Sequence, residues 1–482
     1  MTPLWRAAEA AHATGAKPDG DWTATGVSID TRSLVPGDLF VALQADRDGH
    51  AFAAKAAEAG AAAALVTHRP PDCPPNFPLL VVPDTLAGLT ALGAAARARA
   101  RAKVVAVTGS VGKTSSKEML RTGLAAQGRT HAAEKSFNNH WGVPLTLARL
   151  PQDAAFAVIE IGMNAPGEIA PLARLAAPHV ALITTVAAVH LEAFGSVADI
   201  AREKASIAEG LGPQGVLVLN RDCDTYAIQR DYAAARGVFC QSFGRDPAAE
   251  YRQLSVQLSD TATTVRAEHA GAPLFFKLAQ PGRHLADNAM GVLAAIDQLG
   301  ADVPRAALAL AGWSAPEGRG SRWNVVLGDS GIDGRVHLID ESYNANPASM
   351  AAALEVFAAA RPEDDIGRVA RGRRIAFLGD MLELGGDGAA MHAALADLPA
   401  MDAIDIVHTA GPLMHALHQA LPHARRGKWF ADTAALAAQV PRLVDAGDVV
   451  MCKGSLGSRV GMLVAAIKKL GDAQPAKGQE AG

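Results

Sequence analysis

The sequence predicts an α/β protein built from three domains in series. Its 482 residues correspond to roughly three domains at the usual size of about 150 residues each. Short apolar segments alternate with helical stretches along most of the chain, which is typical of parallel sheets covered by helices on both faces. A stretch rich in glycine and proline, residues 312–320, interrupts this alternation and predicts a linker between two domains.

The composition excludes several classes of protein. Hydrophobic residues make up 49% of the chain and charged residues 20%, as in globular proteins. The formal net charge is -4, so no broad basic face for nucleic acid is expected. The cysteines form no CxxC pair, which fits a reducing compartment. Because there is no apolar leader and no apolar run of roughly 18 residues, we expect a cytoplasmic protein without membrane insertion.

The first predicted domain, residues 1–102, is a small α/β unit. It begins with a short helical stretch, and residues 26–43 then alternate in the manner of strands around a Pro-Gly turn. An alanine-rich helix at 52–59 and strands at 63–66 and 79–82 complete the unit.

The second predicted domain, residues 103–316, contains a doubly wound and mostly parallel sheet, since helical stretches separate its apolar strands. Polar and apolar residues alternate over 251–278, which predicts antiparallel hairpins appended to that sheet. The expected parallel strands are 104–107, 157–161, 180–185 and 215–219.

The third predicted domain, residues 317–482, repeats the alternation of strands and helices and is expected to be Rossmann-like. Its last residues, 471–482, are polar and rich in glycine, which predicts a disordered tail. The expected strands are 336–339, 375–378, 404–408 and 449–452.

A phosphate-binding loop is the strongest functional signal. The segment VVAVTGSVGKTSS runs from a strand through a glycine-rich turn into a helix that begins at Lys113. The backbone N–H groups of such a loop and the helix dipole bind phosphate, Lys113 would contact the β- and γ-phosphates, and the Thr114 hydroxyl would ligate Mg²⁺. The full GxxxxGK[ST] pattern needs glycine where Val107 stands, so an ordinary βα turn without phosphate binding remains an alternative interpretation. The loop therefore indicates that the protein binds a nucleoside triphosphate, but it does not distinguish kinases, GTPases, ATPases and ligases.

Five polar residues beyond the loop are candidates for the same site. Glu160 and His190 follow apolar strands, whose carboxyl ends are where parallel sheets bind ligands. A carboxylate suits Mg²⁺, while imidazole is a less usual ligand, so a surface Glu160 and a structural His190 are the alternatives. By spacing alone, Lys204 is a solvated helix residue. His284 and Asn288 share a helix face, where they would recognise a base or merely bridge turns.

Taken in order, the motifs resemble the Mur ligase family of ATP-dependent, amide-forming enzymes of peptidoglycan synthesis. The strings that carry the resemblance are TGSVGKTSS, EIGMN, VHLEAFGS, GRHLADN and KGS, together with Lys204 and the Gly-Arg pair at 318–319. The missing first glycine of the loop is ordinary in that family. The strings FNNHWGVPLTLARL, DESYNANPASM and LGDMLELG are most similar to the members that add D-alanyl-D-alanine to UDP-N-acetylmuramoyl-tripeptide, and no DNPR string is present.

The resemblance implies a role for each domain. The first domain would bind the UDP end of the substrate, the central one ATP and two Mg²⁺, and the third would close over the site. The implied substrate residues are Ser28, Thr31 and Arg32, with Asp48–His50 nearby, and Asn138, Asn139 and Lys453. The implied ATP-binding residues are Gly109, Ser110, Val111, Gly112, Lys113, Thr114, Ser115, His284, Asn288, Arg319, Asp340, Glu341 and Asn344. The implied metal ligands are Thr114, Glu160, His190 and a carbamylated Lys204, and the implied catalytic residues are Lys113, His190, Lys204 and Arg319.

One position departs from the family, which usually has two consecutive aspartates where this chain has Asp340 and Glu341. Either residue, or both, would contact the ribose. The expected reaction converts a substrate carboxylate to an acyl phosphate, which an amine then attacks, in a monomeric enzyme.

The sequence leaves three alternatives open. The chain would be another Mur-type ligase, a folylpolyglutamate synthase-like ligase, or a P-loop switch. The synthase-like ligase lacks a comparable first domain, and a switch should show an NKxD string, to which residues 220–222 are a poor match.

Overall fold

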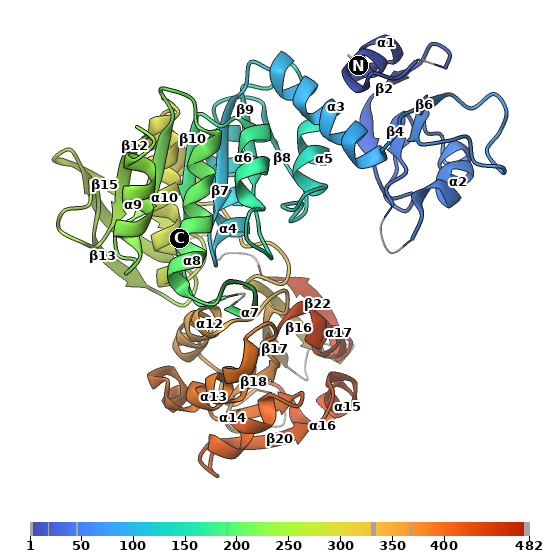
Figure 1. The fold of residues 1–482 in the computed structure, drawn as a ribbon. Coiled ribbons are helices and arrows are strands. Elements are labelled where there is room, and N and C mark those ends of the chain that lie inside the picture. Colours follow the sequence, from blue (N-terminus) through green and yellow to red (C-terminus); the bar gives the residue numbers. More distant parts are fainter. Residues whose placement is uncertain are drawn as a thin grey trace.

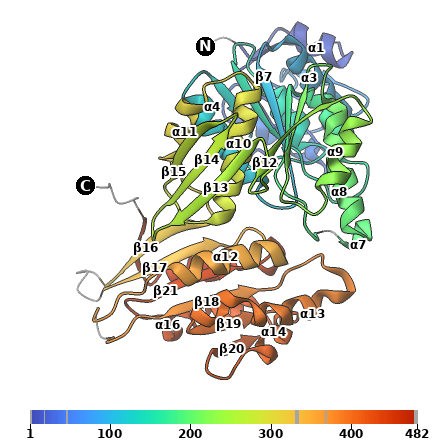
Figure 2. The ribbon, with the colours of Figure 1, turned by 90° about the vertical axis from the view of Figure 1, so that its left-hand side faces the viewer.

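The computed structural model describes residues 3–17, 19–44, 47–189, 191–328, 334–366 and 369–476. The strands divide into three groups that share no sheet, β1 to β6, β7 to β15 and β16 to β22, which we call the N-terminal, central and C-terminal units (Figure 1). The predicted α/β class is confirmed, and the boundaries near residues 102 and 316 remain predictions. Figure 2 shows the C-terminal unit beside the central unit, at the end away from helix α1.

The N-terminal unit is a four-stranded parallel sheet in the order β3-β4-β5-β6, with a short antiparallel pair, β1 and β2. Its core also contains Leu145 and Ala148 of the central unit. The Trp5 indole donates to the Ala148 carbonyl at 2.9 Å, so the two units pack together. The elements are β1 (Trp5–Arg6), α1 (Ala7–Thr14), β2 (Thr23–Ala24), β3 (Gly26–Ser28), β4 (Asp38–Val41), α2 (Ala53–Glu58), β5 (Ala63–Val66), β6 (Leu79–Val81) and α3 (Thr85–Arg99).

The central unit is a nine-stranded sheet in the order β15-β14-β13-β12-β11-β10-β7-β9-β8. It is parallel from β8 to β13, and β13, β14 and β15 form the predicted antiparallel hairpins. The strands are β7 (Lys103–Thr108), β8 (Thr130–Ala132), β9 (Phe156–Glu160), β10 (Val180–Ile183), β11 (Val216–Asn220), β12 (Phe239–Gly244), β13 (Tyr251–Leu258), β14 (Thr263–His269) and β15 (Ala272–Leu278).

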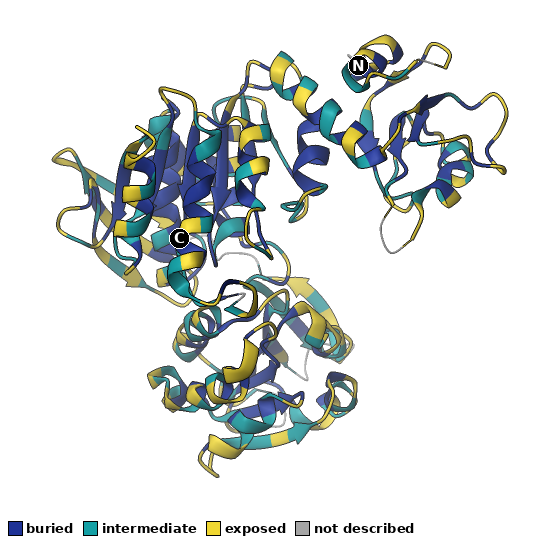
Figure 3. Ribbon diagram, in the orientation of Figure 1, coloured by how far each residue is buried: buried dark blue, intermediate teal, exposed yellow. Residues whose placement is uncertain are grey.

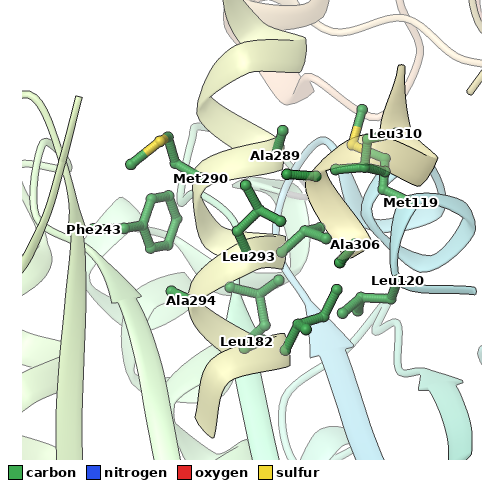
Figure 4. Close-up of a cluster of buried hydrophobic side chains, with 14 of the residues drawn as sticks. Met119, Leu120, Leu182, Phe243, Ala289, Met290, Leu293, Ala294, Ala306 and Leu310 are labelled. Atoms are coloured by element: carbon green, nitrogen blue, oxygen red, sulfur yellow. The ribbon is translucent and has the colours of Figure 1, made fainter. Parts of the chain in front are cut away.

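Helices cover both faces of this sheet, which explains why its strands are continuously apolar. On β7, Val105 and Val107 join the core under one set of helices, and Val104 joins the core of the opposite face. Figure 4 shows side chains of α10 packed between Phe243 and Leu120. The helices are α4 (Lys113–Ala125), α5 (Gly142–Ala148), α6 (Ile169–Ala176), α7 (Leu191–Phe194), α8 (Val197–Ala205), α9 (Tyr226–Ala234), α10 (Arg283–Gln298) and α11 (Val303–Leu310).

The C-terminal unit is a seven-stranded sheet in the order β20-β19-β18-β21-β17-β16-β22, parallel except for β16 and β22. Its inner strands β18 and β21 are buried, whereas β20, β16 and β22 are partly exposed, and Figure 3 shows partly exposed helices around them. The elements are β16 (Ser321–Leu327), β17 (Arg335–Glu341), α12 (Pro347–Ala359), β18 (Arg374–Gly379), α13 (Gly388–Ala393), β19 (Ile406–Ala410), α14 (Met414–Ala420), β20 (Arg426–Phe430), α15 (Thr433–Ala437), α16 (Val440–Leu443), β21 (Val449–Lys453), α17 (Gly461–Lys468) and β22 (Gly471–Pro475).

The predicted disordered tail is wrong for its first residues. Gly471–Pro475 forms β22, which pairs with β16 from Trp323 to Leu327. An edge strand is held by backbone hydrogen bonds, so a polar sequence does not exclude it. Residues 477–482 lie outside the described residues. Within the described ranges, every helix is too short or too polar to cross a bilayer.

Candidate active site

The glycine-rich turn between β7 and α4 has a backbone conformation that requires glycine at two positions. Gly109 and Gly112 have φ angles of 153° and 84°. A Cβ at Gly112 would lie 2.5 Å from the Asn288 amide oxygen, so this turn needs glycine for backbone freedom and for space. The loop is tied to the end of β10, because Ser110 N donates to the Thr185 carbonyl at 2.8 Å. The start of α4, with its free backbone N–H groups, is therefore held in a fixed orientation.

Lys113, the first residue of α4, folds back over this loop. Its Nζ donates to the Gly109 carbonyl at 2.7 Å. Burial lowers the pKa of Lys113, Glu160 opposes that shift, and Arg319 adds to it. A phosphate group beside the loop would supply the negative charge that this buried ammonium lacks.

Glu160 is a buried carboxylate at the end of β9. Both of its oxygens lie 3.1 Å from the Thr114 hydroxyl, and Asn138 Nδ2 donates to one of them at 2.8 Å. Thr114 Oγ1 is also 3.0 Å from Ser136 Oγ. The structure thus brings the predicted metal ligands Thr114 and Glu160 together beside the phosphate loop.

These side chains border a cavity of about 480 Å³ between the central and C-terminal units. Among the residues predicted from the sequence, its walls contain Ser110, Val111, Gly112, Lys113, Thr114, Ser115, Asn138, Asn139, Glu160, His284, Asn288, Arg319, Glu341, Asn344 and Lys453. Gly109 is absent from the walls but holds Lys113 through its carbonyl.

The C-terminal unit contributes two cations to the cavity. Arg319 Nη2 reaches across to Ser136 Oγ at 3.2 Å, and its guanidinium lies 4.0 Å from the centre of the Tyr343 ring. Lys453 Nζ is buried and donates to Glu341 Oε2 at 3.3 Å and to the Asn344 carbonyl at 3.0 Å. Together with Lys113, these groups make a cavity suited to a polyanion.

Asp340 and Glu341 are separated by the pleat of β17. Glu341 lines the cavity, whereas Asp340 does not. Asp340 is buried and accepts hydrogen bonds from the backbone N–H and the hydroxyl of Ser342, at 3.0 and 2.6 Å. Of the two residues predicted to contact the ribose, only Glu341 thus faces the cavity, because successive residues of a strand point to opposite sides.

His284 and Asn288 lie on one face of α10 and both line the cavity, as their spacing predicts. Burial lowers the pKa of His284, and Glu341 opposes that shift. The side-chain amide of Asn288 lies against Gly112. This pair therefore forms the wall next to the phosphate loop.

Lys204 is buried in α8, contrary to its interpretation from spacing as a solvated residue. Its Nζ lies 3.7 Å from the sulfur of Met163, which lines the cavity. Burial and then Lys113 lower the pKa of Lys204 well below its ordinary value, and Glu203 opposes that shift. His190, the other residue predicted for this part of the site, lies outside the described residues.

The predicted substrate residues Ser28, Thr31 and Arg32 lie in the N-terminal unit, at the carboxyl end of β3, and do not line this cavity. Arg32 pairs with Asp30 at 2.6 Å and is largely exposed. The predicted DGH turn is ordered by Asp48, which accepts from His50 N at 3.0 Å. The structure therefore separates these residues from the phosphate loop, as expected for a long substrate with two contact regions.

Comparison with known proteins identifies the family. Residues 107–296 match the Mur ligase middle domain, and residues 321–456 match the Mur ligase, glutamate ligase domain. The UDP-N-acetylmuramoyl-tripeptide–D-alanyl-D-alanine ligase of Escherichia coli (strain K12) is 35% identical over 94% of this chain and 95% of its own length. The chain belongs to the Mur ligase family.

Further relatives agree with this assignment. A Mur ligase of the same name from Bacillus subtilis (strain 168) is 33% identical, over 95% of this chain and 96% of its own. A crystal structure of MurF from Acinetobacter baumannii superposes with a TM-score of 0.80 at 27% identity, covering 97% of this chain and 100% of that one. The resemblance drawn from the sequence motifs is thereby confirmed.

Sequence reasoning missed several residues of this Mur ligase that line the cavity. Ser136 links Thr114 to Arg319, and Tyr343 carries the Arg319 guanidinium. Thr184 supports the loop, donating to the Val111 carbonyl at 2.6 Å. Ser136 and Tyr343 adjoin or lie within the quoted strings, so their neighbourhood was visible, but their contacts depend on residues far along the chain.

Proposed function

We propose that this Mur ligase joins D-alanyl-D-alanine to the peptide carboxylate of UDP-N-acetylmuramoyl-tripeptide, using ATP, to give the pentapeptide precursor of peptidoglycan. The observation that carries this proposal is a cavity in which a phosphate loop, a buried carboxylate and cations from two units converge. The relatives at 33–35% identity bear the corresponding name over nearly their whole length. They also match this chain across the first unit, which a folylpolyglutamate synthase-like ligase lacks. In this proposal the protein acts in the cytoplasm as a monomer and binds no nucleic acid.

ATP occupies the cavity beside the phosphate loop. The N–H groups at the start of α4 and Lys113 bind the phosphates, and His284 and Asn288 lie by the base. Glu341, rather than Asp340, binds the ribose, since only Glu341 faces the cavity. The UDP end of the other substrate binds at the loop that carries Ser28, Thr31 and Arg32.

The residues around Glu160 fit Mg²⁺. Glu160 is buried, and its hydrogen-bond donors Thr114 and Asn138 are neutral. Mg²⁺ is commonly held by one or two carboxylates together with substrate phosphates, which agrees with the absence of a cluster of three or more His, Cys, Asp or Glu side chains in the described ranges. Thr114 and Glu160 would hold one ion, His190 and Lys204 a second, and the ions would neutralise charge on the transferred phosphoryl group.

Lys204 is carbamylated in the active enzyme. A protonated lysine has the wrong charge for a metal ligand, and the buried position of Nζ favours the neutral amine. The nitrogen lone pair of the neutral amine attacks the carbon of CO₂, and the nitrogen then loses one proton to solvent. The resulting carbamate presents anionic oxygen atoms, the ligand type that Mg²⁺ prefers.

The chain's own cations drive the reaction by holding negative charge. The substrate carboxylate and the γ-phosphoryl group repel each other, and Lys113 and Arg319 offset that repulsion as the acyl phosphate forms. The amine of D-alanyl-D-alanine then attacks the acyl carbon, and phosphate leaves. Because Arg319 comes from the C-terminal unit, closure of that unit completes the site.

The ligase proposal is tested by phosphate release. We expect release from ATP with Mg²⁺ and UDP-N-acetylmuramoyl-tripeptide to depend on D-alanyl-D-alanine, with L-alanyl-L-alanine and glutamate as control acceptors. Mass spectrometry should find the pentapeptide product. Release that ignores the dipeptide would contradict the ligase assignment.

The carbamate is tested separately. We expect ¹³C NMR to detect a carbamate after exchange with ¹³C-bicarbonate in the wild type but not in Lys204→Ala. Formate or acetate should partly restore the activity of Lys204→Ala but not that of Lys113→Ala. A fully active Lys204→Ala variant would refute the modification.

A further inference from the structure

A second cavity, of about 810 Å³, lies at the opposite edge of the central sheet from the phosphate loop. Strand β7 runs from Lys103 to Thr108, directly before that loop, whereas Arg101 of this cavity precedes the strand. At about 3.3 Å per residue, the strand places the two sites about 17 Å apart. Figures 1 and 2 agree, because α1, which contributes Glu9, lies at the end of the molecule away from the C-terminal unit.

Arginine side chains dominate this cavity, which we call the arginine cleft. Five arginines face two carboxylates, Glu9 and Asp153, which leaves an excess of three positive charges. The chain as a whole has a formal net charge of -4, so its general composition does not account for this concentration. The arginines are Arg6, Arg99, Arg101, Arg129 and Arg149.

The positive charge of the cleft is only partly compensated. Arg129 pairs with Asp153, and Arg99 pairs with Glu9 at 3.3 Å. Within the described ranges, Arg6, Arg101 and Arg149 form no ion pair. The Nε of Arg149 donates to the Val27 carbonyl at 2.6 Å, which leaves its terminal NH₂ groups available.

Two of the guanidinium groups are held in place and desolvated. Burial lowers the pKa of Arg149 against the opposing effects of Glu134 and Asp38, and it lowers that of Arg99 against the opposing effect of Glu9. The Arg99 guanidinium lies 3.9 Å from the centre of the Trp5 ring. Its Nε is buried without a hydrogen-bond partner among the described residues. One terminal nitrogen of Arg99 also donates to the Leu4 carbonyl, so the group is fixed in place. A partly desolvated and fixed guanidinium gains strongly from an anion.

We propose that the arginine cleft binds a small oxyanion, carrying at least two negative charges, between the N-terminal and central units. Guanidinium groups donate two parallel hydrogen bonds to phosphate or carboxylate oxygens, which makes several converging arginines specific for such groups. Arg6 belongs to β1, and Arg149 follows α5. A bound anion therefore contacts both units at once.

Calorimetric titration with inorganic pyrophosphate tests this site, using the full chain with Lys113→Ala so that the phosphate loop does not contribute. We expect a binding event that is weakened about tenfold or more by adding Arg6→Ser and Arg101→Ser, and unchanged by adding Arg305→Ser, an exposed arginine outside the cleft. Any binding at the active-site cavity or at the UDP site should not respond to these cleft substitutions. Thermal unfolding checks that these variants fold. Parallel titration with citrate distinguishes a phosphate from a carboxylate ligand. No pyrophosphate or citrate binding to Lys113→Ala, or binding that ignores both cleft arginines, would overturn the proposal.

Discussion

Replacing Arg319 by alanine should lower turnover far more than it lowers the affinity for ATP. In the structure the side chain makes one hydrogen bond to an uncharged acceptor, the Ser136 hydroxyl, and one cation–π contact, with Tyr343. Such contacts contribute about 1 kcal/mol each. In the transition state the same guanidinium would donate two charge-assisted hydrogen bonds to phosphoryl oxygens, worth about 1.5–3 kcal/mol each.

Two such hydrogen bonds correspond to about 3–6 kcal/mol, so kcat should fall by at least about 100-fold, with KM for ATP changed less than about tenfold. Steady-state phosphate release at varied ATP measures both quantities. Arg319→Lys keeps the charge without the forked geometry and should lie between wild type and alanine, and Arg305→Ala is the matched control. An equal loss of ATP affinity would show a ground-state contact instead, and normal turnover would remove Arg319 from the mechanism.

Three further outcomes are expected. Lys113→Ala should abolish ATP turnover while calorimetric binding of the UDP-linked substrate stays nearly intact, because Ser28 and Arg32 lie in another unit; loss of that binding would contradict the assignment of the UDP site. Gly112→Ala should abolish ATP binding, since φ is 84° and the new Cβ would meet Asn288; normal nucleotide binding by calorimetry would contradict the loop geometry. Burial, with Lys428 and Arg373, lowers the pKa of His408 to about 4, so the contribution of the neutral imidazole to stability is present above about pH 6.5 and is lost as the pH falls towards 4. Between pH 7 and 5, the free energy of unfolding of the wild type should therefore fall by about 2 kcal/mol more than that of His408→Gln. Denaturant unfolding measures both values, and equal losses would refute this.

The sheets were predictable because their strands are short apolar runs buried on both faces, as in β7 and β10. Strand β22 was not, because its residues are polar and its pairing partner lies about 150 residues earlier in the chain. Hydrophobic periodicity reflects only residues that are close together in the sequence.

The candidate site shows the same division. Glu160 was predictable because it stands at the end of an apolar strand, and Lys113 and Thr114 because they begin the helix that follows a strand and a glycine-rich turn. The burial of Lys204 was not predictable from spacing, because it depends on Met163, which comes from a distant loop. The orientation of Asp340 was also hidden, since its partner Ser342 forms a local turn that no pattern in the sequence specifies.

The position of β22 links the end of the chain to catalysis. Its partner β16 begins at Ser321, two residues after Arg319, and the two strands pair from Trp323 to Leu327. A chain shortened at residue 470 would expose the outer edge of β16 and loosen the anchor of the Arg319 segment, although every residue of the cavity would still be present. An affinity tag is therefore better attached beyond residue 476 than in place of the final strand.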